Sequence, residues 1–199
     1  MLFDVQLDAK NEIWVDLPYS KDKFGVPSNL FIIGTMNTAD RSVEALDTAL
    51  RRRFSFVEMQ SNPEKLSNVT LKDANNVDLV KMLACINQRI ELLIDKDHQI
   101  GHSFFINLKN LNSLRTVFKN KIIPLLEEYF FGDFGKIGLV LGERFLTVKN
   151  GNENKGVLAK FEAYDDISFL TEKKVYQIND CNNLEVEDFI SIYSTKSNE

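Results

Sequence analysis

The sequence is poor in cysteine, proline and tryptophan, and it contains no long apolar run. Its 199 residues include two cysteines, four prolines and one tryptophan. Cys85 and Cys181 are far apart and lack metal-binding spacing, so we interpret them as reduced thiols of a cytoplasmic protein. No apolar stretch approaches the roughly 20 residues of a membrane-spanning helix, and residues 1–10 lack the segments of a signal peptide. We therefore expect no contact with a membrane.

The sequence also lacks an excess of positive charge. Its formal net charge is -5, whereas a basic balance is typical of nucleic-acid-binding proteins. We therefore expect any contact with DNA to be local or to be made by another part of an assembly. With 44% hydrophobic and 27% charged residues, the chain has the composition of a globular protein with a sizeable core, in one large domain or two small ones.

Two motifs of nucleotide chemistry are missing from these residues. No GxxxxGK followed by Ser or Thr is present to cradle phosphates, and no strand before Phe31 ends in paired acidic residues that could hold Mg²⁺. His98 and His102 are spaced as on one helix face, but Gly101 lies between them and no third ligand accompanies them, so we expect no metal site. Two interpretations of these histidines stay open: a structural histidine, or one that faces a nucleotide in a lid.

The most informative stretch runs from Phe31 to Met59. Residues 30–34 form a short continuous apolar run, which is typical of a central parallel strand buried on both faces. The segment GTMNTADRS follows, and active sites of open α/β sheets lie where strands end. Asn37 could hold a water in line with a terminal phosphate, with Asp40 and Arg41 orienting it or pairing across a subunit boundary. The alternative is a capped turn in which these side chains satisfy backbone groups.

Three consecutive arginines, Arg51, Arg52 and Arg53, lie between a predicted helix and a predicted strand over residues 54–59. Their guanidinium groups repel one another, and an anion supplied by another molecule would relieve that repulsion. Arginine suits a phosphate because its planar fork donates two hydrogen bonds and keeps its charge. An arginine inserted by a neighbour can stabilise the charge on a transferring phosphoryl group. The alternatives are a solvated basic cluster or a contact with nucleic acid.

The rest of the chain divides by composition. Residues 61–77 are polar and predict a linker, while an apolar stripe with helical spacing begins after Asp78 and predicts an amphipathic helix. Residues 113–131 predict a second helix that Pro124 kinks or divides and that Gly132 ends. We therefore predict an α/β protein: the last strands of a parallel sheet (1–60), a linker (61–77), a helical lid (78–145) and a small C-terminal α+β extension (146–199).

Together, GTMNTADRS, ALDTALRRRF, IGHSFF and IIPLLEEYFFGD resemble the McrB group of AAA+ GTPases over roughly residues 10–145. By this resemblance Asn37 is the sensor I residue, and Arg51 and Arg52 act in trans on a neighbour's nucleotide. Asp40, Arg41, Arg53 and His102 then lie around that nucleotide, which is GTP or ATP with Mg²⁺.

The resemblance also implies partners. Members of the group are motor subunits of restriction systems that cut DNA carrying methylcytosine. They form hexameric rings and bind an McrC nuclease subunit, and they contact DNA through a separate N-terminal domain. Walker A, Walker B and that domain precede these motifs in the group, so we expect this chain to be a C-terminal portion, inactive alone. It would be a truncation, a split or decayed gene, or a misassigned start.

Two other functions stay open. The chain could be a catalytically inactive interaction protein that joins or caps rings of a full-length relative. It could also be an ATP-driven AAA+ remodelling protein of the MoxR-like or dynein-like kind, although MNTADRS argues against this because those groups carry looser versions of the segment.

Overall fold

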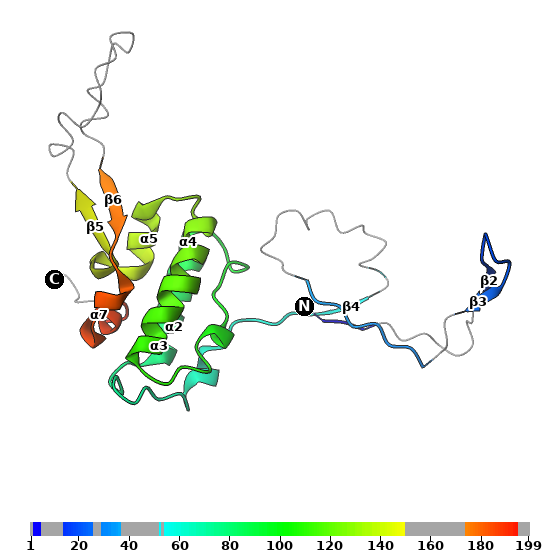
Figure 1. The fold of residues 1–199 in the computed structure, drawn as a ribbon, viewed down its shortest axis with the longest axis horizontal. Coiled ribbons are helices and arrows are strands. Elements are labelled where there is room, and N and C mark those ends of the chain that lie inside the picture. Colours follow the sequence, from blue (N-terminus) through cyan, green and yellow to red (C-terminus); the bar gives the residue numbers. More distant parts are fainter. Residues whose placement is uncertain are drawn as a thin grey trace, which may run out of the picture. The chain divides into compact units, whose positions relative to one another are not determined.

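The computed structural model describes residues 2–4, 14–25, 29–36, 52, 54–149 and 174–194. The chain divides into two compact units, Met1–Gln60 and Ser61–Glu199, and each is described here by itself (Figure 1). Among the helices of these residues, none combines the length and the apolar character that a membrane span requires. Cys85 and Cys181 are both free thiols.

The first unit contains two short antiparallel strand pairs. Strand β1 (Leu2–Asp4) pairs with β4 (Ser55–Val57), and β2 (Trp14–Asp16) pairs with β3 (Lys23–Gly25). The strand predicted over residues 54–59 is therefore confirmed, with β4 inside that range. Gly25 is required opposite Trp14, because a Cβ at this glycine would come within 2.8 Å of the indole ring.

The apolar run at residues 30–34 does not form the predicted parallel strand. Phe31, Ile32 and Ile33 are 58%, 50% and 69% exposed and lie outside any strand, and every strand pair among the described residues is antiparallel. An apolar run is buried on both faces only when strands flank it and helices cover it. The part of this unit that the structure describes supplies only three-residue pairs, so the prediction of a parallel sheet was wrong for it.

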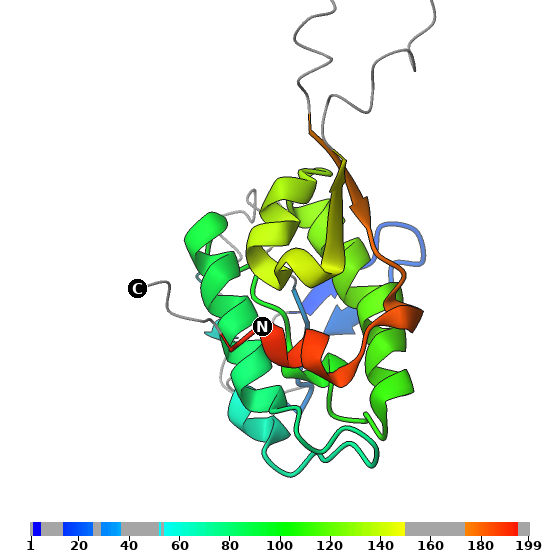
Figure 2. The same ribbon diagram turned by 90° about the vertical axis from the view of Figure 1, so that its left-hand side faces the viewer.

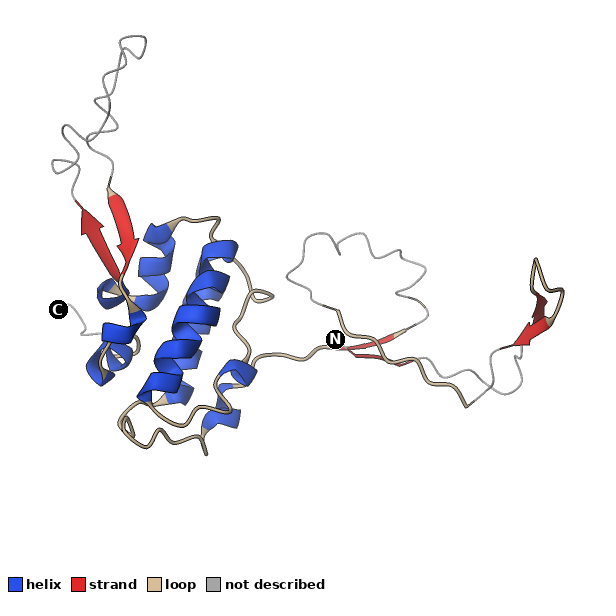
Figure 3. Cartoon of the chain, viewed as in Figure 1, coloured by secondary structure: helices blue, strands red, loops and turns tan. Residues whose placement is uncertain are grey.

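The second unit is a compact helical body with a β-hairpin on one side (Figures 1, 2 and 3). Its helical elements, in chain order, are η2 (Pro63–Leu66), α2 (Leu79–Leu93), η3 (His102–Phe104), α3 (Leu111–Val117), η4 (Phe118–Ile122), α4 (Ile123–Tyr129), α5 (Phe134–Leu141), η5 (Glu143–Phe145), η7 (Cys181–Asn183) and α7 (Val186–Ser191). The hairpin pairs β5 (Leu146–Lys149) with β6 (Val175–Ile178).

Helix α2 begins where the sequence predicts. The Asp78 carboxylate caps it by accepting a hydrogen bond from the backbone N–H of Lys81 at 3.0 Å, which satisfies one of the free amides of the first turn. The side chains of Leu83, Ile86 and Ile90 are fully buried, as the apolar stripe predicts. This face of α2 is the centre of the unit's core.

The Asp78 cap should make the stability of the second unit depend on pH. The hydrogen bond from the Lys81 amide lowers the pKa of Asp78 below its usual value, so the cap stabilises the fold above about pH 4 and its contribution is lost as pH falls through the folded-state pKa. Asp78→Ala should cost about 1 kcal/mol at pH 7 and less in acid, at a pH below the folded-state pKa of Asp78. Urea unfolding followed by far-UV circular dichroism would measure this, and Asp78→Asn is the control because it caps without titrating. Equal losses at both pH values would contradict it.

The predicted helix over residues 113–131 is divided, as Pro124 indicated. The N–H of Ile123 donates to the carbonyl of Phe118, five residues back, so a π-helical turn separates α3 from α4. Pro124 has no N–H to donate, and its ring would crowd the carbonyl four residues before it in a regular α-helix. The wider turn directly before Pro124 opens the ladder at that place.

The end of α4 also lies near its predicted position. Gly132 has a φ of 73°, and its N–H donates to the carbonyl of Glu127 at 2.9 Å, which closes the helix. Phe131 precedes it with a φ of 51°, and its side chain is 85% exposed. Asp133 then caps α5 by accepting from the N–H of Lys136 at 3.2 Å.

Residues 61–77 are not the predicted linker. Leu66, Leu71 and Ala74 are at most 2% exposed, and the Asp73 carboxylate accepts from the N–H of Leu111 at 2.6 Å, at the start of α3. The polar composition of this stretch conceals apolar residues spaced three to five apart, which are enough to bury one side of a loop against the helices.

The predicted C-terminal extension likewise does not stand apart. Leu184, Phe189 and Ile192 belong to the same core as the helices, and Arg115 fixes the backbone before α7 by donating to the carbonyl of Leu184 at 2.6 Å. The described residues from 61 onward therefore share one core.

Candidate functional site

Most residues predicted to carry the chemistry lie outside the described part of the chain. These are Asn37, Asp40, Arg41, Arg51 and Arg53. Two members of the predicted set are described: Arg52 in the first unit and His102 in the second.

Arg52 lies in an exposed turn shortly before β4. Among the residues that the structure describes, no carboxylate forms an ion pair with its guanidinium. An exposed guanidinium can donate hydrogen bonds to an external anion. This is the condition that a phosphate-binding arginine must meet.

His102 lies at the start of η3, partly buried. Its Nδ1 accepts a hydrogen bond from the backbone N–H of Asn62 at 3.1 Å, so this nitrogen carries no proton. The proton of the neutral ring is therefore on Nε2, where it can be donated to another group. One ring nitrogen therefore has a structural partner, as the first interpretation predicts, and a nucleotide-facing role for the other nitrogen stays a prediction.

His98 has a structural environment. Its Nδ1 lies 2.7 Å from Oδ1 of Asp95, its side chain is 14% exposed, and its ring meets Tyr129 edge to face at 4.8 Å. The hydrogen bond with His98 is the main reason that the pKa of Asp95 lies below its usual value. Across the described ranges there is no cluster of three or more His, Cys, Asp or Glu side chains that could hold a metal ion.

Asn87 is a candidate that no sequence motif indicated, and it is the polar residue that is buried among the described residues. Its side chain is 4% exposed on α2; Nδ2 donates to Oγ of Ser61 and to the carbonyl of Ile100, both at 3.0 Å. Its Oδ1 accepts from the N–H of Ile100 at 2.7 Å. A signal was present, because Asn87 stands four residues after Leu83 and three before Ile90, within the apolar stripe.

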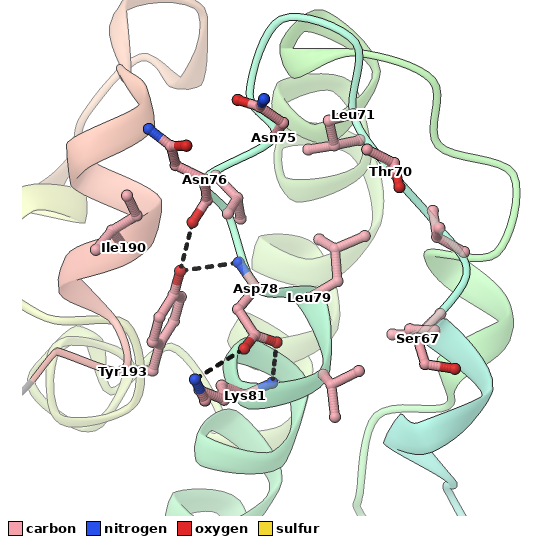
Figure 4. A pocket seen from close by; sticks show the side chains of 14 residues that line it. Ser67, Thr70, Leu71, Asn75, Asn76, Asp78, Leu79, Lys81, Ile190 and Tyr193 are labelled. Carbon is pink, nitrogen blue, oxygen red and sulfur yellow. Dashed lines mark hydrogen bonds and ion pairs between the residues drawn. The ribbon is translucent and has the colours of Figure 1, made fainter.

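A pocket of about 580 Å³ opens at the N-terminus of α2 (Figure 4). On one side the hydroxyl of Tyr193 accepts from the N–H of Asp78 at 2.9 Å and donates to the carbonyl of Asn76 at 3.4 Å. On the other side Asp78 pairs with Lys81 at 3.0 Å. These groups satisfy one another, and neither Arg52 nor His102 lines the pocket.

Comparisons with known proteins agree with the motifs. Residues 78–138 match the family model of the McrB alpha-helical lid domain. The chain is 39% identical over 145 residues to the type IV methyl-directed restriction enzyme EcoKMcrB subunit of Escherichia coli (strain K12), covering 63% of this chain and 32% of that protein. It is 30% identical over 154 residues to the type II restriction enzyme BsuMI component YdiS of Bacillus subtilis (strain 168), covering 74% of this chain and 44% of that protein.

The chain thus spans less than half the length of either relative. The matched lid residues run from the Asp78 cap of α2 into α5, so they cover the centre of the helical body described above. The resemblance indicated by the sequence motifs is confirmed: the chain is similar to McrB-like restriction subunits, and its residues 78–138 match the McrB alpha-helical lid domain.

Proposed function

We propose that this chain supplies the sensor I, arginine and lid portions of an McrB-like AAA+ GTPase or ATPase in a DNA restriction system. The observation that carries the proposal is the order of two features in one chain: GTMNTADRS and LRRRF come first, and the McrB lid follows at residues 78–138. The names of both relatives, a methyl-directed restriction enzyme subunit and a restriction enzyme component, support the cellular role.

In this proposal the chain's residues act on a nucleotide held by a phosphate loop from elsewhere. Asn37 orients the attacking water, with Asp40 and Arg41 beside it, and Arg51 and Arg52 stabilise charge on the transferring phosphoryl group from a neighbouring subunit. Arg53 and His102 add hydrogen-bond donors around the nucleotide. Taken separately, the exposed Arg52 and the Nε2 proton of His102 are each groups that can donate to an anion.

A bound Mg²⁺ would neutralise charge on the β- and γ-phosphates. The residues that the structure describes offer no group of three acidic or histidine ligands. In this proposal the metal would be held with the phosphates on the side of the phosphate loop, and this chain would contribute the cations and the amide.

The partners that follow are a ring of McrB-like subunits and an McrC-like nuclease subunit, in the cytoplasm, with 5-methylcytosine DNA contacted only through the assembly. A second candidate function is a catalytically inactive protein that joins or caps such rings.

A chimera tests the proposal directly. Residues 30–194 of this chain would replace the corresponding segment of the E. coli relative, which leaves the phosphate-loop side of that protein in place. We expect the purified chain alone to show negligible turnover and the chimera to hydrolyse nucleotide, with GTP and ATP assayed in parallel to identify the substrate. A chimera that assembles without hydrolysing either nucleotide, while this chain lowers the rate of the intact relative, would favour the capping protein instead.

A further inference from the structure

The two histidines of the chain are held in opposite tautomers. The Nδ1 of His102 accepts from a backbone N–H, which is only a donor, so its proton lies on Nε2. The Nδ1 of His98 lies 2.7 Å from the carboxylate of Asp95, which is only an acceptor when ionised, so the proton of His98 lies on Nδ1. The fold therefore specifies the tautomer of each ring, as a hydrogen bond to one imidazole nitrogen generally does.

The donor that fixes His102 is itself held by a buried network. Asn62 follows Ser61, whose hydroxyl donates to the carbonyl of Ile100 at 2.7 Å and accepts from Nδ2 of Asn87 at 3.0 Å. Asn87 also makes two hydrogen bonds with the backbone of Ile100, two residues before His102. One side chain on α2 therefore anchors both the segment that donates to His102 and the segment that carries it.

The cost of burying a polar amide indicates that this network positions the two backbone segments that it joins. Asn87 lies on the same face of α2 as Leu83 and Ile90, which are fully buried, and a polar amide there is costly unless all its groups are paired. Every buried side-chain polar atom in the described chain has a partner, those of Asn87 included. A satisfied buried amide tied to two backbone segments restricts where they can lie more than an apolar residue would.

We propose that Asn87 is a positioning residue, which acts through Ser61 and Asn62 to hold His102 as an Nε2–H donor toward an anionic oxygen of a bound nucleotide. The ligand in this inference rests on the proposed function, whereas the tautomer and its dependence on Asn87 do not. An Nε2–H that is held in one orientation can donate to a phosphate oxygen without prior rotation or tautomerisation of the ring.

Nitrogen NMR of the ¹⁵N-labelled full chain without nucleotide tests the positioning. In the wild type we expect a proton on Nε2 of His102, a proton on Nδ1 of His98, and a nitrogen–nitrogen coupling across the hydrogen bond from Asn62 to His102. Asn87→Ala should abolish that coupling and leave His98 unchanged, which makes His98 an internal control. Gln88→Ala, at the exposed neighbouring position, should change neither ring.

The same variants in the chimera test the ligand. His102→Ala and Asn87→Ala should each raise KM for the nucleotide about tenfold with a smaller effect on kcat, and the double variant should be no worse than His102→Ala. If Asn87→Ala does not fold, Ser61→Ala removes the bridging hydroxyl alone and should weaken the coupling.

Three results would overturn the inference: a proton on Nδ1 of His102, a coupling that survives Asn87→Ala, or a KM unaffected by His102→Ala. A chimera without any turnover would instead refute the proposed function and the ligand assigned to His102. The nucleotide-free spectra would still decide whether Asn87 positions the ring.

Discussion

Replacing Arg52 by alanine is expected to lower nucleotide turnover about a thousandfold in an assembly where this chain faces a neighbour's nucleotide, because arginines that stabilise a transferring phosphoryl group contribute that much or more. The exposed turn that carries Arg52, without an ion-pair partner among the described residues, is consistent with such a role. Arg52→Lys should recover only part of the rate, since an ammonium lacks the planar fork. The measurement is steady-state GTP and ATP hydrolysis by the chimera.

Mixing subunits would show whether the arginines act in trans. A chimera with Arg51→Ala and Arg52→Ala keeps its phosphate loop, whereas this chain has the arginines and no such loop. Adding the full chain to that variant should restore turnover, and adding the Arg52→Ala chain should restore less. Arg144→Ala is the matched control, because its side chain is also exposed, at 66%, and pairs only loosely with Asp188 at 3.8 Å. Failure of the full chain to restore any activity would contradict donation in trans.

Helix α2 shows what the sequence could predict. A capping carboxylate predicts where a helix begins, and apolar residues three and four apart predict which face is buried. Both predictions are correct for α2. Local signals also predicted the division at Pro124 and the strand over residues 54–59. These features depend on neighbours in the chain.

The π-helical turn was not predicted, although its signal is in the spacing. Leu114, Phe118, Ile122 and Leu126 are all fully buried, and each lies four residues after the last. In a regular α-helix, four residues overshoot one turn by about 40°, so such a series drifts off the core face. A wider turn over residues 118–122 reduces the drift, and the strict spacing of four is therefore a signature of it.

The remaining misses involve contacts distant in the sequence. The burial of Leu66 and Leu71 depends on helices formed by later residues, and the role of Asn87 depends on Ser61, 26 residues before it, and on Ile100, 13 residues after it. At residues 30–34 the sequence predicted burial and the structure shows exposed side chains. A continuous apolar run indicates burial only where other layers cover the strand. Sequence motifs alone predicted the site residues Asn37 and the three arginines. Of all the predicted site residues, the structure describes Arg52 and His102.

Replacing Phe118 by alanine should destabilise the second unit by about 4 kcal/mol, the usual loss for a large aromatic deleted from a well-packed core. Phe118 is fully buried on the π-helical turn, and its ring centroid lies 6.2, 5.5 and 5.1 Å from those of Phe105, Phe145 and Phe189. These neighbours come from three separate segments of the unit. Deleting the ring therefore removes the contacts by which η4 holds the segment after η3, η5 and α7 together, and a fixed backbone cannot refill the space.

The chain offers a matched control and two separable signals for this measurement. Phe131→Ala removes the same ring from an 85% exposed position and should change stability by less than about 0.5 kcal/mol. Far-UV circular dichroism follows the helices of the second unit, while the single tryptophan, Trp14, reports on the first. Phe118→Ala should lower the urea midpoint of the helical signal and leave the Trp14 transition in place, because the ring cluster lies wholly within residues 61–199. A loss as small as that of Phe131→Ala would mean that the four rings do not hold this core together.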